Sequence, residues 1–434
     1  MTTVSRRTFT KGLVASIMAV YGTPFLPRHV WAEAAGALGL PSVALVGGTN
    51  DDNAETYLRT ALEGLGGINR FIKAGQSVAI KVNVTWDAPP NTASNTDPEL
   101  LRAMIKLVRE AGASRVIVCD HVIGSETSAS VTLPLSGIGK VLEETRVEKA
   151  IMAGVDEPDD RYVTIDAPKS KSIDGKQFGV IKAAAQANVR INMAVAKSHI
   201  VTPLTMTLKH MMGLMRYPGY LHTVNLDQGI ADINTAEAIH CDLHLLEAIR
   251  VRLTGAAWGW GNESQADPRD PSRSKIVKRF NQILVGTDPV LIDAYGANTY
   301  FKGYKPEAKG ILHILRASQA GLGEIDVEKA LAAGQLQSFR AGQPVAQPTA
   351  VPTPGQLVAA QPQATPTLLA AAPALPVPPT FAPQPATASG APIANSEVVL
   401  NYVPALSGAL VPVVAIVAAL GLVVRRRMAL RQES

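Results

Sequence analysis

The chain has 434 residues and a formal net charge of +5, but the excess positive charge lies at its two ends. Basic residues outnumber acidic ones in residues 1–34 and 425–434, whereas residues 35–340 carry no net charge. A core without a basic run argues against nucleic acid as a partner. The only cysteines, Cys119 and Cys241, belong to no C-x-x-C pair, which argues against an iron–sulfur cluster or a cysteine-built zinc site.

The N-terminus has the pattern of a twin-arginine export signal. The motif S-R-R-T-F-T-K at residues 5–11 precedes an apolar run from Gly12 to Leu26. Ala32-Glu33-Ala34 offers a cleavage site. The sequence therefore predicts a signal peptide over residues 1–34 and the twin-arginine translocase as a partner during export. Because this route carries folded proteins, it is compatible with a cofactor loaded before export.

The C-terminal part predicts a tethered membrane anchor. Residues 341–402 form a Pro/Ala-rich linker, which cannot bury enough apolar surface to fold. The uncharged, mostly apolar stretch 403–424 is long enough for one transmembrane helix, and residues 425–434 follow as a basic tail. By the positive-inside rule, the tail lies in the cytoplasm and the core lies outside the cytoplasmic membrane.

The core, residues 35–340, alternates strand and helix patterns. Such repeats predict an α/β fold with a mostly parallel, doubly wound sheet and a small insertion. The less regular Arg161–Ile181 predicts either an antiparallel excursion or a small second lobe. The predicted strands are Ser42–Val46, Ser77–Val84, Arg115–Asp120, Val189–Ala196 and Gln282–Gly286. The predicted helices are Ala54–Leu65, one opened by Asp97-Pro98, Leu204–Leu214, Gly229–Val251, Pro289–Phe301 and Pro306–Ala320.

Polar residues follow four of the predicted strands, and ligands bind such sheets beyond the carboxyl ends of their strands. The strand ends predicted to meet at one edge carry Lys81 with Asn83, Asp120, Lys197 with His199, and Asp288. The densest group adds Thr205 and Lys209, whose spacing of four residues predicts that they share one face of a helix. Two lysines, a histidine and threonine hydroxyls favour an anion pocket for phosphate or carboxylate. The alternative is that the lysines are solvated charges beside a helix.

These motifs together resemble the family of domain of unknown function 362 (DUF362) over about residues 42–325. The resemblance rests on their order: Lys81-Val82-Asn83, Thr96-Asp97-Pro98, Lys197-Ser198-His199, the T-x-x-x-K-x-x-x-G run from Thr205 to Gly213, His222, and Thr287-Asp288-Pro289 with Asp293. It implies an α/β fold and a site at these residues, and it implies no reaction, because the family's activity is not established.

Three departures from the family pattern stand out. His210 occupies a position where the family usually has Asn, and Glu247 is the nearest match to an aspartate that often follows the position of His222. The ferredoxin-type cysteine motifs of many relatives are missing here.

The sequence leaves the identity of any cofactor open, but several residues are candidate ligands for a divalent metal. Asp120, Asp288 and His222 form the predicted metal set. His240 and His244 lie four apart on a predicted helix, but a surface pair of histidines is the more common meaning of that spacing. His313 lies on the apolar face of a predicted helix and is assigned no role.

Two functions remain open from the sequence. In the first, the core is an enzyme acting on a small anionic molecule, with His199, Lys197 and Lys209 as catalytic residues and Lys81, Asn83 and Thr205 binding the anion. In the second, it is a non-catalytic protein on a stalk that binds an anion or a metal. A scaffold with a decayed site is a third interpretation.

Overall fold

The computed structural model describes residues 40–122, 128–152, 158–166, 177–199, 202–223, 225–254, 276–301, 304–305 and 311–345. The predicted signal peptide, transmembrane helix and basic tail lie outside these residues, as does the linker beyond residue 345. No helix within the described ranges is both long and apolar enough to cross a bilayer.

Eleven strands are formed by the described residues. They are β1 (Val43–Gly47), β2 (Ser77–Lys81), β3 (Arg115–His121), β4 (Glu148–Met152), β5 (Tyr162–Asp166), β6 (Gln177–Ile181), β7 (Val189–Ser198), β8 (Leu204–Thr205), β9 (Leu243–Arg252), β10 (Val277–Gly286) and β11 (Leu336–Arg340).

The helices connect these strands. They are α3 (Ala54–Gly64), α4 (Pro98–Glu110), α5 (Ser128–Leu135), α6 (Ile138–Thr145), α7 (Lys182–Ala185), α8 (Thr207–His210), α9 (Leu226–Asn234), α10 (Pro289–Tyr300), α11 (Leu312–Gln319) and α12 (Val327–Ala332). Short 3₁₀ turns cover Ile68–Arg70, Pro90–Thr92, Asp159–Arg161, Met211–Leu214 and Pro218–Thr223.

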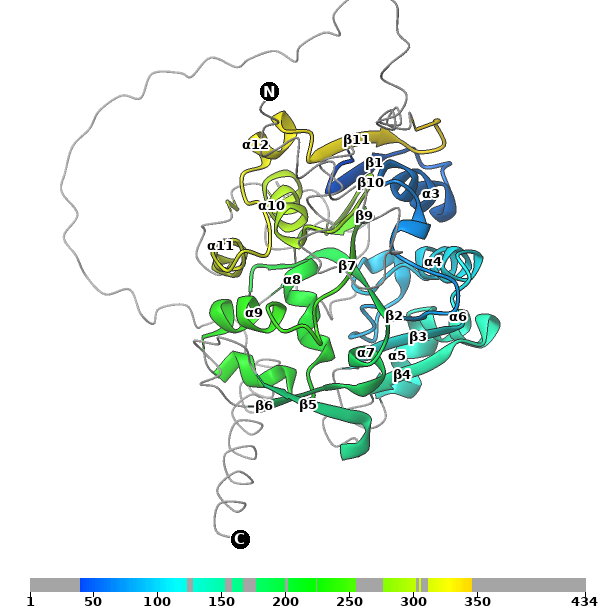
Figure 1. The fold of residues 1–434 in the computed structure, drawn as a ribbon, viewed down its shortest axis with the longest axis vertical. Coiled ribbons are helices and arrows are strands. Elements are labelled where there is room, and N and C mark those ends of the chain that lie inside the picture. Colours follow the sequence, from blue (N-terminus) through cyan, green and yellow to red (C-terminus); the bar gives the residue numbers. More distant parts are fainter. Residues whose placement is uncertain are drawn as a thin grey trace, which may run out of the picture. The chain divides into compact units, whose positions relative to one another are not determined.

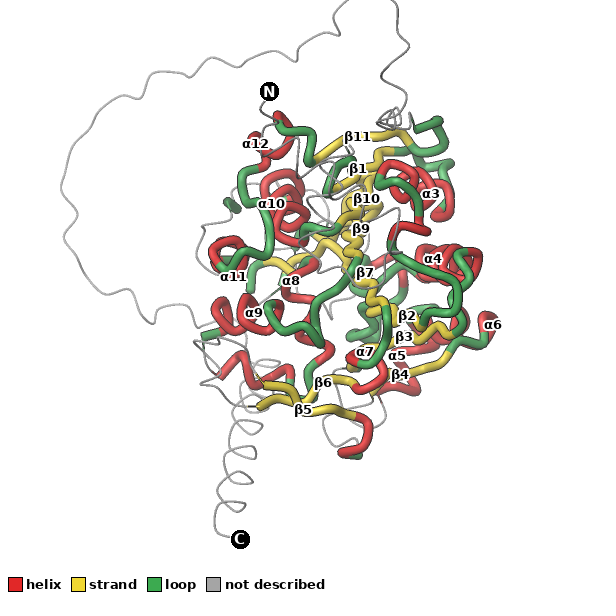
Figure 2. The backbone as a smooth tube through the Cα atoms, viewed as in Figure 1, coloured by secondary structure: helices red, strands yellow, loops and turns green. Residues whose placement is uncertain are grey.

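One large sheet organises the fold, with strand order β11-β1-β10-β9-β7-β2-β3-β4 (Figure 2). The pairs β9–β7, β7–β2, β2–β3, β3–β4 and β1–β11 are parallel, whereas β10 runs antiparallel to both of its neighbours. The short strand β8 adds an antiparallel pair to β7. The predicted mixed α/β fold with a mostly parallel sheet is thereby confirmed.

Helices cover both faces of this sheet. Figure 1 shows α3, α4 and α6 on one side, and α8, α9, α10 and α11 on the other. Each face buries its own apolar cluster, which is expected where every strand of a parallel sheet is covered on both sides. The candidate residues on α8 therefore belong to the face that α9, α10 and α11 also cover.

Predictions that rest on local signals agree with the structure. The predicted helix at Ala54–Leu65 is α3, and Asp97 caps α4 by accepting a hydrogen bond from the backbone N–H of Glu99. The irregular segment Arg161–Ile181 contributes the antiparallel pair β5–β6. Local capping and periodicity sufficed for these elements because few distant contacts are needed to form them.

The predicted helix Gly229–Val251 is wrong. The chain forms α9 only to Asn234 and then enters β9, which is buried along nearly its whole length. A strand buried on both faces shows a continuous apolar run, and its periodicity cannot be told from that of a buried helix. His240 and His244 therefore do not share a helical face; their ring centroids lie 6.3 Å apart.

Asp288 does not join the strand-end edge at which it was predicted. It follows Gly286, which pairs with His244 near the start of β9, whereas Lys197 pairs with Arg252 at the end of β9. Because β10 runs antiparallel to β9, Asp288 lies at the end of the strands opposite to the end that carries Lys197. Its carboxylate accepts hydrogen bonds from the backbone N–H groups of Leu291 and Glu324, so it caps α10.

Gly213 allows the backbone to approach a buried ion pair. Lys81 Nζ lies 2.6 Å from Asp120 Oδ1, and both side chains are almost fully buried. A Cβ atom on Gly213 would lie 2.4 Å from Asp120 Oδ1 and 2.8 Å from Lys81 Nζ. The glycine that ends the T-x-x-x-K-x-x-x-G run is thus required by close packing against this pair.

Glu247 lies on the opposite side of the sheet from α8. Its Oε2 atom accepts a hydrogen bond of 2.9 Å from the backbone N–H of Asp97, at the start of α4. Burial, followed by the charge of Asp97, raises the pKa of Glu247 to about 8. Glu247 therefore supports the helix and is not an acid of the α8 side.

The first prediction concerns Gly213→Ala. The added methyl group must displace Lys81 or Asp120, so we expect a loss of about 1–3 kcal/mol in the free energy of unfolding, measured by urea denaturation. Gly219→Ala is the control, because nothing lies within 4 Å of its added Cβ. Equal stability of the two variants would contradict the close approach.

The second prediction concerns Glu247→Gln. In the wild type, the folded state keeps a proton that the unfolded state loses above the ordinary pKa of 4.5, so stability falls as pH rises from about 5 to 8. The stability of the variant should not fall in this way. The free energy of unfolding of the variant minus that of the wild type should therefore be larger at pH 8 than at pH 5, by about 1 kcal/mol or more. Thermal denaturation across this pH range measures it. Glu99→Gln, at an exposed position, should run parallel to wild type; parallel behaviour of Glu247→Gln would refute the prediction.

Candidate functional site

Asp293 fixes the short helix α8, which carries Lys209 and His210. Its carboxylate accepts hydrogen bonds from the backbone N–H groups of Thr207 (2.8 Å) and Leu208 (2.9 Å), and from the Thr207 hydroxyl (2.5 Å). Burial raises the pKa of Asp293 to about 7, although these hydrogen bonds oppose the rise. Asp293 therefore positions α8 and leaves no carboxylate oxygen for a ligand.

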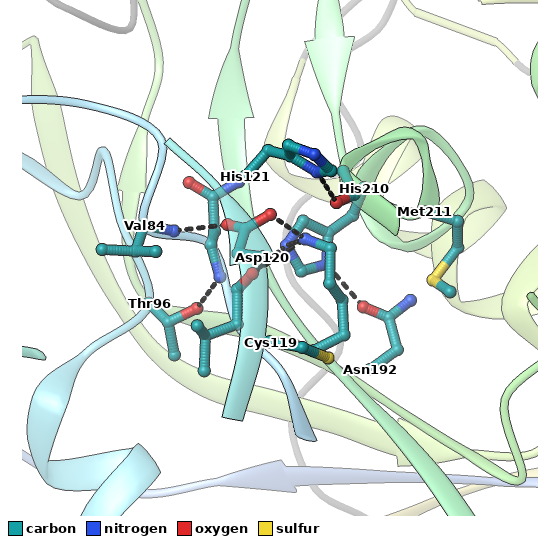
Figure 3. A network of polar contacts seen from close by, with 12 residues as sticks. Val84, Thr96, Cys119, Asp120, His121, Asn192, His210 and Met211 are labelled. Carbon is teal, nitrogen blue, oxygen red and sulfur yellow. Dashed lines mark hydrogen bonds and ion pairs between the residues drawn. The ribbon is translucent and has the colours of Figure 1, made fainter. Parts of the chain in front are cut away.

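The carboxylate of Asp120 is also fully engaged. Oδ1 contacts Lys81, and Oδ2 accepts a hydrogen bond of 2.7 Å from the backbone N–H of Val84 (Figure 3). Lys81 also donates to the carbonyl oxygen of Val82 at 2.8 Å. The Lys81–Asp120 pair thus joins the ends of β2 and β3 and forms one wall of the candidate site.

His210 extends this wall as a neutral imidazole. Its Nδ1 atom lies 2.5 Å from Asn192 Oδ1, and its Nε2 atom lies 2.9 Å from Lys81 Nζ (Figure 3). The Asn192 amide nitrogen donates to Thr207 O, which leaves its oxygen as an acceptor. Nδ1 of His210 therefore carries the proton. Burial, then the charges of Lys81 and Lys197, lower the pKa of His210 well below its ordinary value.

Lys197 is buried among neutral acceptors. Its Nζ atom donates to Asn83 Oδ1 at 2.9 Å and to the carbonyl oxygen of Ser94. Burial and the charge of Lys209 lower the pKa of Lys197 well below its ordinary value, and Asp120 opposes this effect. Asn83, predicted to bind an anion, uses its oxygen to hold Lys197.

Three buried hydroxyl groups have no hydrogen-bond partner within the described residues: those of Ser94, Thr202 and Thr205. Thr205 lies opposite Lys197 in the β7–β8 pair, where side chains point to the same face. Ser94 touches the Lys197 ammonium through its carbonyl oxygen. Since buried hydroxyls are normally bonded, this group indicates unfilled hydrogen-bonding capacity beside Lys197.

The charge of Lys209 acts on Lys197, His199 and His210. Lys209 is 9 % exposed, and in the described part of the chain it makes no hydrogen bond or ion pair. Burial lowers its pKa to about 8. Burial, then the charges of Lys209 and Lys197, lower the pKa of His199 to about 2, so His199 is neutral beside the two lysines.

The structure thus brings together most of the predicted residues: Lys81, Asn83, Asp120, Lys197, His199, Thr205 and Lys209. His222 is exposed, and Asp288 is at the opposite edge. The predicted metal ligands Asp120, Asp288 and His222 do not converge. Within the described residues, no three His, Cys, Asp or Glu side chains form a group that could hold a metal ion.

Sequence reasoning missed a histidine–aspartate pair on the same face. His313, predicted to lie on an apolar helix face, is buried, and its Nδ1 atom lies 3.1 Å from Asp227 Oδ1. Asp227 is five residues after His222 and is thus much nearer in sequence than Glu247. The position of Asp227 shortly after His222 could have indicated a functional acid. Its contact with His313 on α11 could not be predicted from the sequence.

A family model supports the resemblance that the motif order indicates. The family described as domain of unknown function (DUF362) matches residues 78–298. The thylakoid-associated protein sll1697 of Synechocystis sp. is 29% identical over 200 residues, which are 44% of this chain and 57% of that protein. The chain therefore matches little more than half the length of this relative.

Among solved structures, the lactate racemase apoprotein from Thermoanaerobacterium thermosaccharolyticum has 12% sequence identity and a TM-score of 0.33, over 48% of this chain and 51% of its own. A likeness this slight bears on neither fold nor function. The family match covers half of the chain and confirms the resemblance found in the motifs. This protein belongs to the DUF362 family.

Proposed function

We propose that the core is an enzyme acting on a small anionic molecule, a phosphate or a carboxylate, that binds beside Lys197 and Lys209. One observation carries the proposal: the Lys209 ammonium is buried and has no acidic partner in the described residues. Burying an uncompensated charge is costly, and a bound anion would offset that cost.

The surroundings of Lys209 supply further donors for an anion. The free hydroxyls of Ser94, Thr202 and Thr205 lie on segments that contact or flank Lys197. Phosphate and carboxylate oxygens accept several hydrogen bonds at once, and charge-assisted bonds are the strongest of them. A bound anion would therefore accept hydrogen bonds from these hydroxyls as well as from the lysines.

Two groups in this site could accept a proton from a substrate. Burial and the charge of Lys209 lower the pKa of Lys197, so Lys197 gives up its proton more readily than an exposed lysine does. His199 is neutral in the field of both lysines. A bound anion would offset that field and raise the pKa of His199 toward the range in which general acid–base catalysis is efficient.

A non-catalytic anion-binding protein is the second candidate. It is favoured by the contacts of Lys197, because Asn83 and the Ser94 carbonyl hold its ammonium in place as a structural lysine would be held. In either case we propose that the core is displayed outside the cytoplasmic membrane, on the evidence of the terminal sequences.

The third prediction tests anion binding. Inorganic phosphate and succinate are titrated separately into the full-length protein by isothermal calorimetry, and we expect at least one to bind. Lys209→Met should lower that affinity about tenfold or more, since it removes a buried ammonium that has no partner in the part of the chain that the structure describes. Lys140→Met is the matched control, because Lys140 is 75% exposed on α6 and should leave the affinity unchanged.

The two arms distinguish phosphate from carboxylate recognition. No binding of either anion, or equal affinity in wild type and Lys209→Met, would overturn the proposal.

A further inference from the structure

We propose that His313, oriented by Asp227, is a proton-carrying side chain of the Lys209 site. This inference rests on the proposed anion-binding function and adds to it a residue pair from α9 and α11. Neither residue belongs to the motifs that defined the predicted site, and the mechanism above does not use them.

The geometry of the pair fixes the imidazole. Asp227 Oδ1 lies 3.1 Å from His313 Nδ1 and accepts a second hydrogen bond, also 3.1 Å, from the His313 backbone N–H. A carboxylate can only accept, so Nδ1 carries the proton and Nε2 presents its lone pair. The double contact holds the ring at the first turn of α11 in one orientation.

Nε2 of His313 has no hydrogen-bond partner among the described residues, although the side chain is only 1% exposed. A buried ring with one nitrogen tied to a carboxylate and the other free has the arrangement of a general base supported by an acid.

His313 lies within the electrostatic reach of Lys209. Helix α11 packs against both α8 and α9, which carry Lys209 and Asp227. Burial lowers the pKa of His313, Asp227 raises it, and the Lys209 charge lowers it further. An anion bound by Lys209 would remove the last of these effects and leave the support from Asp227.

Asp227 is ionised and available for this role. Burial would raise its pKa, but the hydrogen bonds from His313 and the charge of Arg316 oppose burial, and the pKa lies below its ordinary value. Arg316 also bonds Asn225, the residue that caps α9. The acid is thereby kept charged behind the imidazole.

Different charges act on His313 and His199. His199 faces the positive field of Lys197 and Lys209, which lowers its pKa to about 2 after burial has acted. His313 faces Lys209 from one side and Asp227 from the other. His313 therefore has a carboxylate, that of Asp227, to stabilise its protonated form.

The alternative is that Asp227 and His313 only tie α9 to α11, and the fourth prediction separates the two roles. The full-length protein, labelled with ¹⁵N in its histidine rings, is titrated with the tighter-binding of phosphate and succinate. We expect the Nε2 signal of His313 to move toward its protonated position, with a rise in the His313 pKa of about 1–3 units. In Lys209→Met the same addition should leave His313 unchanged.

His313→Gln assigns the signal, and Asp227→Asn assigns it independently by altering the Nδ1 resonance of the same ring. Asp227→Asn should also lower the His313 pKa in the presence of the anion, because the carboxylate no longer supports the imidazolium. If calorimetry shows Lys209-dependent binding but the His313 signals and pKa do not change, the pair is a structural tie and this inference fails while the proposed function stands. If neither anion binds, the proposed function fails, and this inference fails with it.

Discussion

The burial of lysine ammonium groups at one edge of the sheet is the constraint on which the rest of this structure depends. Lys81, Lys197 and Lys209 are each at most 9 % exposed. In the described residues, Asp120 is the only acid in ion-pair contact with any of them. Proteins avoid such arrangements, because desolvating a charge costs several kcal/mol unless a partner repays it. This cost is offset differently at each lysine. Lys81 forms an ion pair, whereas Lys197 donates to neutral acceptors and has a lowered pKa. Lys209 is buried and has no partner among the described residues.

The polar groups around the lysines hold the site in place before any ligand arrives. Asp293 caps α8, Asn192 fixes the tautomer of His210, and His210 faces Lys81. These contacts connect β7 and α10 with α8, so Lys209 is held by elements from distant parts of the sequence. A preorganised site avoids the cost of ordering side chains when a ligand binds. His210 replaces the usual Asn of the family and still bonds on both sides, so this departure leaves the wall of the site intact.

Local chemistry made much of the fold predictable, whereas long-range pairing did not. The Asp97-Pro98 start of α4 and the end of β3 follow from residues within one turn or strand. The direction of β10 is set by its neighbours β1 and β9, and nothing in its own sequence marks it as antiparallel; this is why Asp288 was placed at the wrong edge. The lysines of the site were found because they follow strand ends. Asp227 and His313 were missed because they meet only when α9 and α11 pack together.

The carboxylate of Asp227, which contacts His313, also bears on the choice between an enzyme and a binding protein. A protein that only captures an anion gains from positive charge and loses affinity from any ionised carboxylate close to the bound anion. If an anion binds at Lys209 as proposed, Asp227 would be such a carboxylate: His313 and Arg316 lower its pKa, and it is paired to a ring that feels the Lys209 charge. Its presence is unfavourable for capture alone, but a proton-transferring imidazole requires it, because the carboxylate fixes the tautomer and stabilises the imidazolium that forms. We therefore propose that the arrangement around Lys209 serves chemistry on an anion and not its storage.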